Sequence, residues 1–135
     1  MISSFLKKVW ILNKVFMGKL LTIEDDVQLR ETLTEILEVY GHTVVQASDG
    51  EEGVEVFSKT CPDLVICDIN MPKMDGFQVL EKLNTLVGPS KLPPFIFLSA
   101  KNQQKNIQRA LDLGAVDFIT KPYSTKELLK LIDLW

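Results

Sequence analysis

Four segments of the sequence place charged or hydroxyl side chains directly after short apolar runs. Glu24 and Asp25 follow the first run, and Asp68 follows the third. Ser99 comes at the end of the fourth run and Lys121 at the end of the fifth. Carboxylates that lie close together repel one another and need a cation, and hard oxygen ligands suit Mg²⁺. These residues therefore predict a magnesium site wherever the fold brings the ends of the runs together.

The same residue types are suited to phosphoryl transfer. A carboxylate such as Asp68 can attack phosphorus and form an acyl phosphate. Mg²⁺ would neutralise the phosphoryl oxygens, Lys121 would add a fixed positive charge, and the Ser99 hydroxyl could hydrogen-bond one oxygen. The sequence shows no glycine-rich phosphate loop and no serine or cysteine nucleophile with a partner base. Phosphoryl transfer is thus predicted to depend on the positions and charges of these residues.

Five apolar runs are predicted as the strands that must position these residues. They are short, β-branched or aromatic, and nearly continuous in apolar character, as in strands that are covered on both faces. The runs are Lys19–Ile23, Thr43–Ala47, Leu64–Cys67, Phe95–Leu98 and Asp117–Thr120.

The segments between and after the runs have a period near 3.6 residues and predict five helices. These are Leu29–Tyr40, Gly50–Thr60, Phe77–Leu86, Gln103–Leu113 and Ser124–Leu134. Gly41 and Gly114 are predicted to end two of them, Asp26 to cap the first, and Ser124 with Glu127 to form a capping box at the last. This (βα)₅ alternation predicts an α/β fold, a doubly wound parallel sheet with its functional residues at the carboxyl ends of the strands.

Composition favours one ordinary globular domain. The 135 residues are 46% hydrophobic and 24% charged, with a net charge of −3. An acidic pI near 5.2 argues against direct binding to nucleic acid, which needs a basic face. No apolar run is long enough to insert into a membrane. Cys61, Cys67 and His42 make neither a disulfide framework nor a metal site, so a cytoplasmic location is expected.

The first 17 residues are predicted to be an extension of the domain at 18–135. Ile2, Phe5, Leu6, Val9, Leu12 and Phe16 follow a helical stripe, and the three lysines fall off it. Two interpretations stay open. Residues 2–16 form a helix that docks on the apolar last helix, in the same chain or a neighbour, or they are a disordered leader ahead of a start at Met17.

At this point four motifs resemble the receiver domains of response regulators, with chemotaxis-regulator-like folds. They are Leu20–Asp26 (LLTIEDD), Asp63–Gly76 (DLVICDINMPKMDG), Leu98–Ala100 (LSA) and Thr120–Tyr123 (TKPY). Each motif alone is weak, but the four occur in the family's order and at its intervals. The resemblance covers residues 18–135 and implies a flavodoxin-like sheet with strand order 2-1-3-4-5.

The resemblance assigns roles to the residues at the strand ends. Asp68 would be the phosphoacceptor. Glu24 and Asp25 would be the acidic pair that holds Mg²⁺ with Asp68, and the backbone carbonyl of Asn70 would be a further ligand. Lys121 would contact the phosphoryl group.

Further positions in the motifs match the family's conformational switch and its loops. Ser99 matches the switch hydroxyl and Phe118 the switch aromatic. The bond from Lys121 to Pro122 is expected to be cis. Gly76 is expected to permit a positive φ in the loop that follows the acceptor.

The function implied is signal relay in a two-component phosphorelay, with self-catalysed phosphorylation and dephosphorylation as the only enzymatic activity. A histidine kinase or histidine phosphotransfer protein would donate the phosphoryl group. The fourth helix, fifth strand and fifth helix would then present a switched face to a downstream effector protein, to a missing output domain, or to a second copy in a homodimer. That dimer is in doubt, because Asp117 fits its charge pattern but Leu131 stands where an arginine is expected.

Two other classes share parts of this pattern. An aspartyl-phosphate phosphatase would also use an aspartate and Mg²⁺, but it needs a second acid where this chain has Asn70. A flavodoxin-like electron carrier would need a hydroxyl- and glycine-rich loop after the first strand, where this chain has three acids. A receiver that signals without phosphate is disfavoured by the intact site residues.

Overall fold

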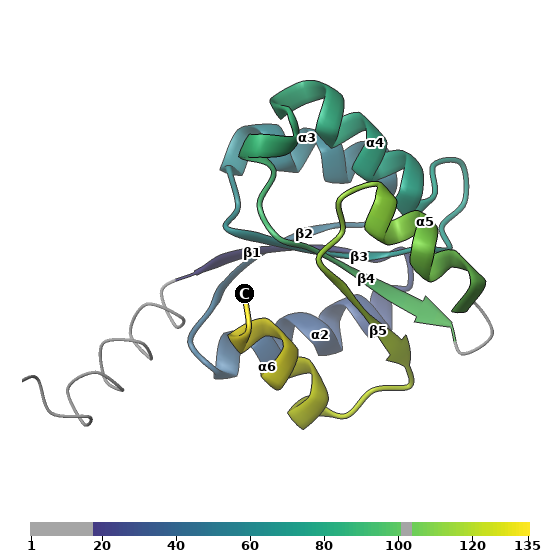
Figure 1. Ribbon diagram of the computed structural model, residues 1–135. Coiled ribbons are helices and arrows are strands. Elements are labelled where there is room, and N and C mark those ends of the chain that lie inside the picture. Colours follow the sequence, from purple (N-terminus) through teal and green to yellow (C-terminus); the bar gives the residue numbers. More distant parts are fainter. Residues whose placement is uncertain (1–17, 101–103) are drawn as a thin grey trace, which may run out of the picture.

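A computed structural model describes residues 18–100 and 104–135 of the chain. Its five strands form one parallel sheet in the order β2-β1-β3-β4-β5 (Figure 1). The strands are β1 (Lys19–Ile23), β2 (Thr43–Ala47), β3 (Leu64–Asp68), β4 (Phe95–Ala100) and β5 (Asp117–Lys121). The predicted fold class, strand order and number of strands are confirmed. Three strands extend beyond their predicted ends, β3 to Asp68, β4 to Ala100 and β5 to Lys121, so that Asp68, Ser99 and Lys121 lie within the last residues of their strands.

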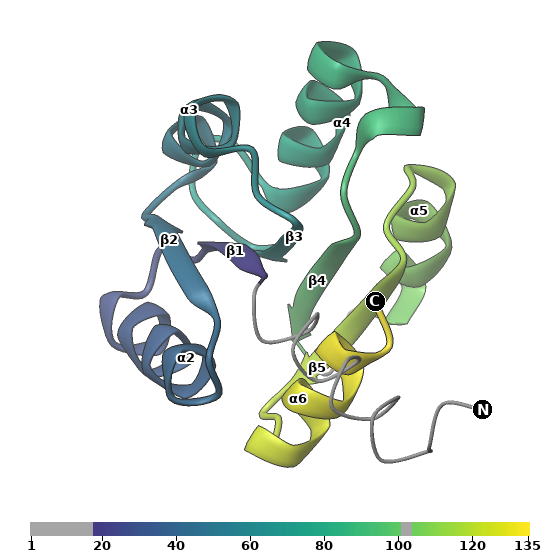
Figure 2. The same ribbon diagram turned by 90° about the vertical axis from the view of Figure 1, so that its left-hand side faces the viewer.

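Five α-helices cover the two faces of the sheet. They are α2 (Val27–Val39), α3 (Gly50–Thr60), α4 (Gly76–Val87), α5 (Ile107–Asp112) and α6 (Thr125–Asp133). Helices α3, α4 and α5 lie on one face, and α2 and α6 lie on the other (Figures 1 and 2). Two short 3₁₀ helices, η1 (Pro89–Lys91) and η2 (Gln104–Asn106), complete the connections.

The sheet is buried between two apolar layers, one for each set of helices. Leu21, Ile23 and Val65 belong to the layer under α3, α4 and α5. Leu20 and Ile66 belong to the layer under α2 and α6. Successive strand residues alternate between the two layers because successive side chains point to opposite faces of a strand. This burial explains the continuous apolar runs in the sequence.

Capping side chains set most of the helix starts. The Asp26 side chain accepts a hydrogen bond from the Leu29 amide, and the Ser124 side chain accepts one from the Glu127 amide, so both residues are N-caps as predicted. The bond that would complete the predicted capping box, from the Ser124 amide to the Glu127 side chain, is not found among the described residues; Asp75 and Gln78 form a capping box at α4 instead. Gly41 and Gly114 have positive φ values of 95° and 102° after the helices that they end.

The fourth predicted helix is shorter than expected. The sequence pattern indicated a helix over 103–113, but α5 begins at Ile107 after the 3₁₀ turn η2. The extension at residues 1–17 lies outside the described residues, and so does the proposed helix at 2–16. Within the described parts of the chain, no helix is both long and apolar enough to cross a membrane.

Candidate functional site

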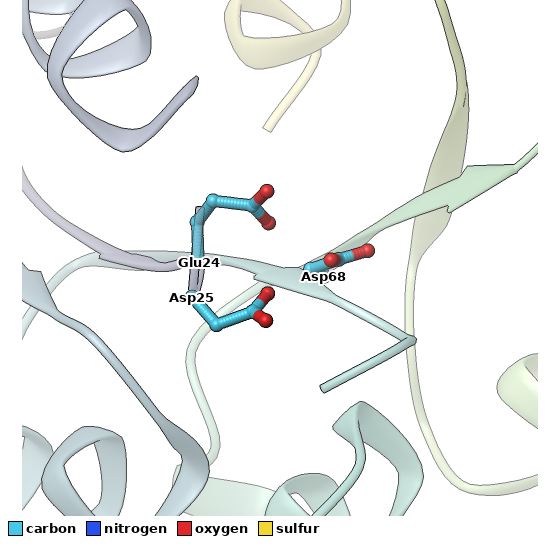
Figure 3. A group of neighbouring side chains, drawn as sticks. All are labelled: Glu24, Asp25 and Asp68. Carbon is cyan, nitrogen blue, oxygen red and sulfur yellow. The ribbon is translucent and has the colours of Figure 1, made fainter. Parts of the chain in front are cut away.

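Three carboxylates meet at the carboxyl ends of β1 and β3. These two neighbouring strands flank the point where the connection changes direction, since β2 lies on one side of β1 and β3 on the other. Glu24, Asp25 and Asp68 each offer an oxygen, and these oxygens lie within 4.8 Å of one another (Figure 3). Glu24 is only 2% exposed and Asp68 only 6%. Asp25 is exposed, so the cluster is open to solvent on the side where Asp25 lies.

Lys121 brings a positive charge from β5 into this cluster. Its Nζ lies 3.2 Å from Oε1 of Glu24 and 3.3 Å from Oδ1 of Asp68. The bond between Lys121 and Pro122 is cis, as expected. The ammonium therefore bridges the two buried carboxylates, and the cluster keeps an excess of negative charge.

The pKa of Glu24 is strongly shifted by its burial and by this excess of negative charge. Burial raises the pKa of Glu24 from its ordinary 4.5 to about 8, and the hydrogen bond and the charge of Asp68 act in the same direction. Lys121 lowers this pKa but does not offset the other causes. A cation held by these oxygens would remove the penalty. Three carboxylates with one open side suit Mg²⁺, which prefers oxygen ligands and keeps part of its water shell.

The loop after β3 folds back onto Asp68. The Gly76 amide donates a hydrogen bond to the Ile69 carbonyl at 2.8 Å. A Cβ on Gly76 would lie 2.5 Å from the Asp68 carbonyl oxygen. The expectation of a positive φ at Gly76 was wrong, because Gly76 is the first residue of α4 and Lys73 takes the positive φ of 68° in this loop. The glycine is needed for close approach instead.

The predicted switch residues lie on β4 and β5, beyond the carboxylates. Ser99 is buried, and its hydroxyl donates to the Ala100 carbonyl at 3.1 Å. Phe118 is half-buried against the core. Ser99, Phe118 and Ile107 line the same small cavity beneath α5. Asn70 is exposed on the loop after β3.

Two residues near the site were not predicted from the sequence. The Arg30 guanidinium donates to the Glu24 backbone carbonyl at 2.8 Å and so ties α2 to the end of β1. Burial raises the pKa of Tyr123, as do the charges of Glu24 and Asp68. Tyr123 belongs to a quoted motif, but nothing in the pattern indicated that the carboxylates would act on it. Arg30 had no sequence signal.

Leu131 packs against the core layer beneath α2 and α6. Asp117 accepts a hydrogen bond from the neighbouring Phe118 amide at 2.8 Å. Leu131 is therefore an apolar, half-buried residue at the position where the charge pattern of the expected dimer requires an arginine.

Comparison with known proteins agrees with this fold. The family model described as response regulator receiver domain matches residues 20–133. The probable transcriptional regulator ycf27 of Porphyridium aerugineum is 38% identical over 110 residues, which are 82% of this chain and 44% of that protein. The transcriptional regulatory protein DltR of Streptococcus agalactiae is 39% identical over 116 residues, which are 86% of this chain and 50% of that protein.

Solved structures show the same fold. Chemotaxis protein CheY4 of Vibrio cholerae has a TM-score of 0.82 at 28% identity, covering 87% of this chain and 98% of that one. A receiver domain protein from Clostridium thermocellum has a TM-score of 0.80 at 28% identity, covering 87% and 93%.

The chain belongs to the response regulator receiver family. It is a receiver domain of two-component signalling with an acidic pocket at the ends of β1 and β3. Such a domain implies a kinase partner in general. The chain spans about half the length of the curated relatives named here. Family membership sets aside the phosphatase and electron-carrier alternatives.

Proposed function

We propose that Asp68 accepts a phosphoryl group from a phosphohistidine of a histidine kinase or histidine phosphotransfer protein. The observation that carries this proposal is the position of Asp68. Its carboxylate lies 3.3 Å from the Lys121 ammonium and beside the carboxylates of Glu24 and Asp25. A carboxylate oxygen of Asp68 forms a bond to phosphorus while the donor P–N bond breaks, and the leaving imidazole takes up a proton.

Asp25, Asp68 and the backbone carbonyl of Asn70 would hold Mg²⁺, with Glu24 as the second member of the acidic pair. The bound ion supplies positive charge to the phosphoryl oxygens during transfer. Lys121 would turn from its carboxylate partners to the phosphoryl group and stabilise it with a permanent positive charge. Phosphoryl transfer depends mainly on such positioning and charge, so these residues suffice.

The switch proposed for this receiver uses Ser99 and Phe118. In the unphosphorylated chain the Ser99 hydroxyl donates to Ala100 rather than to the acceptor. Rotation toward a phosphoryl oxygen would break this bond and move the cavity wall that Ser99 shares with Phe118. The phosphorylated state then favours another arrangement of α5, β5 and α6.

The α5–β5–α6 face would pass the signal to a downstream effector protein, an output domain, or a second copy of the chain. The relatives named as transcriptional regulators are about twice the matched length, which supports an output activity outside the receiver. We place this relay in the cytoplasm, where a kinase would meet the domain. A homodimer through this face would have to form without an arginine at position 131.

Intact-protein mass after incubation with acetyl phosphate and Mg²⁺ tests the proposal. The wild-type chain should gain one phosphoryl group, and Asp68→Asn or addition of EDTA should abolish the gain. An adduct that survives in Asp68→Asn would reject Asp68 as the acceptor. If the wild-type chain shows no adduct and also fails to bind beryllofluoride, the phosphoryl relay itself is rejected.

A further inference from the structure

Helices α2 and α6 lie on the same face of the sheet (Figures 1 and 2). A groove runs along α6 from Thr125 to Leu134, and Tyr40 at the end of α2 lines its other side. Its apolar lining consists of Tyr40, Leu129 and Leu134, and Lys126, Lys130 and Asp133 add mixed charge. The groove begins at Thr125, which also lines the cavity beside Glu24 and Lys121, and extends away from the carboxylate site to Leu134.

The groove leaves large apolar side chains in water. Leu134 is 66% exposed and Tyr40 is 43% exposed, whereas Leu128 and Ile132 of the same helix α6 are buried. Sheet packing therefore buries one side of α6, whereas in the groove Leu129 is only half-buried and Leu134 is exposed. Exposed apolar surface of this kind commonly marks a contact with another segment or protein.

The chain itself enters the described structure at this end of the groove. The Gly18 carbonyl accepts a hydrogen bond from the Thr43 amide at 3.1 Å. Thr43 lies three residues after Tyr40, with buried His42 between them. Burial lowers the pKa of His42, and the nearby charge of Asp133 on α6 opposes this shift in part. Gly18, to which residues 1–17 are joined, therefore lies close to the end of α2 and to the last turn of α6.

The tethered segment has the composition of a covering element. Eleven of its 17 residues are apolar, and six of these follow one helical stripe from Ile2 to Phe16. Lys7, Lys8 and Lys14 fall off the stripe. At a rise of about 1.5 Å per residue, a helix over residues 2–16 is about 22 Å long, which is longer than the nine-residue α6.

We propose that residues 2–16 dock with their apolar stripe in the groove between α2 and α6 of the same chain. A tether this short gives an effective concentration near the millimolar range, so a weak contact suffices. The groove lining carries charges of both signs, so they give little net attraction to the lysines of residues 2–16. We therefore expect the apolar stripe to supply most of the affinity. This inference is independent of phosphorylation at Asp68.

Amide hydrogen exchange tests the contact in the full chain. We expect exchange in the last turn of α6 and around Tyr40 to be slower by about tenfold or more than in a chain that begins at Met17. Equal exchange in the two chains, with the β3 amides equally protected in both, would overturn the proposal.

Two matched substitutions separate docking from a general effect of the segment. Val9→Asp places a charge in the stripe, and Ile11→Asp places the same charge on the opposite side. Val9→Asp should remove the protection of α6, and Ile11→Asp should keep it. If both variants behave alike, the stripe does not dock.

Disulfide trapping identifies which chain occupies the groove. A Val9→Cys variant that also carries Lys126→Cys or Lys130→Cys, with Cys61→Ser, should form an intramolecular disulfide at micromolar protein concentration. A disulfide between two chains, or no disulfide in either pair, contradicts docking within the same chain.

Discussion

Lys121 and Glu24 are 97 positions apart in the sequence, yet the Lys121 ammonium lies 3.2 Å from the Glu24 carboxylate. The same ammonium lies 3.3 Å from Asp68, so one cation faces two buried carboxylates. Burial is the main reason why the pKa of Glu24 is raised, and the neighbouring Asp68 adds to it more than Lys121 offsets. The site is therefore sensitive to pH and to added cations.

Thermal stability without metal should fall as pH rises toward 8. The pKa of Glu24 is about 8 in the folded chain and near 4.5 when unfolded, so the folded chain binds more protons in this window. The contribution is fully present below about pH 4.5 and is lost as pH rises through about 8. Melting curves in EDTA between pH 5 and 9 measure it, and Glu24→Gln should flatten this part of the pH dependence.

Mg²⁺ should raise the melting temperature more at pH 8.5 than at pH 6. At the higher pH Glu24 has lost its proton, so a bound cation offsets repulsion that protonation offsets at the lower pH. Melting curves at fixed free Mg²⁺ check this, with Asp25→Asn as the variant that should lose the response. A larger shift at pH 6 would contradict the charge argument.

Lys121→Gln should weaken binding of beryllofluoride, a phosphoryl analogue, by about tenfold or more, because a hydrogen bond to a charged group is worth about 1.5–3 kcal/mol. Titration followed by NMR measures the affinity. Lys126→Gln removes an exposed lysine on α6 and serves as the control. Equal losses in the two variants would show that the effect is one of net charge and not of the position of Lys121.

Gly76→Ala should destabilise the fold by about 1–3 kcal/mol, the usual cost of overpacking. Its Cβ would lie 2.5 Å from the Asp68 carbonyl oxygen, which is backbone and cannot rotate away. Gly53→Ala is the matched control, because its Cβ would meet the Ile23 side-chain terminus, at 2.6 Å. Urea unfolding should show a greater loss for Gly76→Ala, and that variant alone should also lose phosphorylation.

The strand ends were predictable because each apolar run stops at a charged or hydroxyl residue. Asp68 follows such a run directly, and parallel strands bring their carboxyl ends to one edge of the sheet. The helix starts at Val27 and Thr125 were indicated by capping residues. Helix α5 has no such signal, because Asn106 makes no side-chain capping bond, and its start was misplaced.

Contacts that depend on how neighbouring elements pack were beyond the sequence pattern. The bond from Arg30 to the Glu24 carbonyl depends on how α2 lies across β1, which no spacing rule gives. Gly76 was correctly singled out but for the wrong reason, since the close approach to Asp68 exists only once the loop has folded back.

Thr22→Val should stabilise the protein by about 1 kcal/mol. A buried hydroxyl without a partner loses its hydrogen bonds to water on folding and forms no hydrogen bond that replaces them. Thr22 is fully buried in β1, and no hydrogen bond to its Oγ1 is found among the described residues. Valine has nearly the same shape and favours strands. Thr60→Val is the control, since the Thr60 hydroxyl donates to the Val56 carbonyl at 2.7 Å and its removal should not stabilise. Urea unfolding measures both, and a loss of stability in Thr22→Val would show that this hydroxyl is satisfied, for example by a buried water.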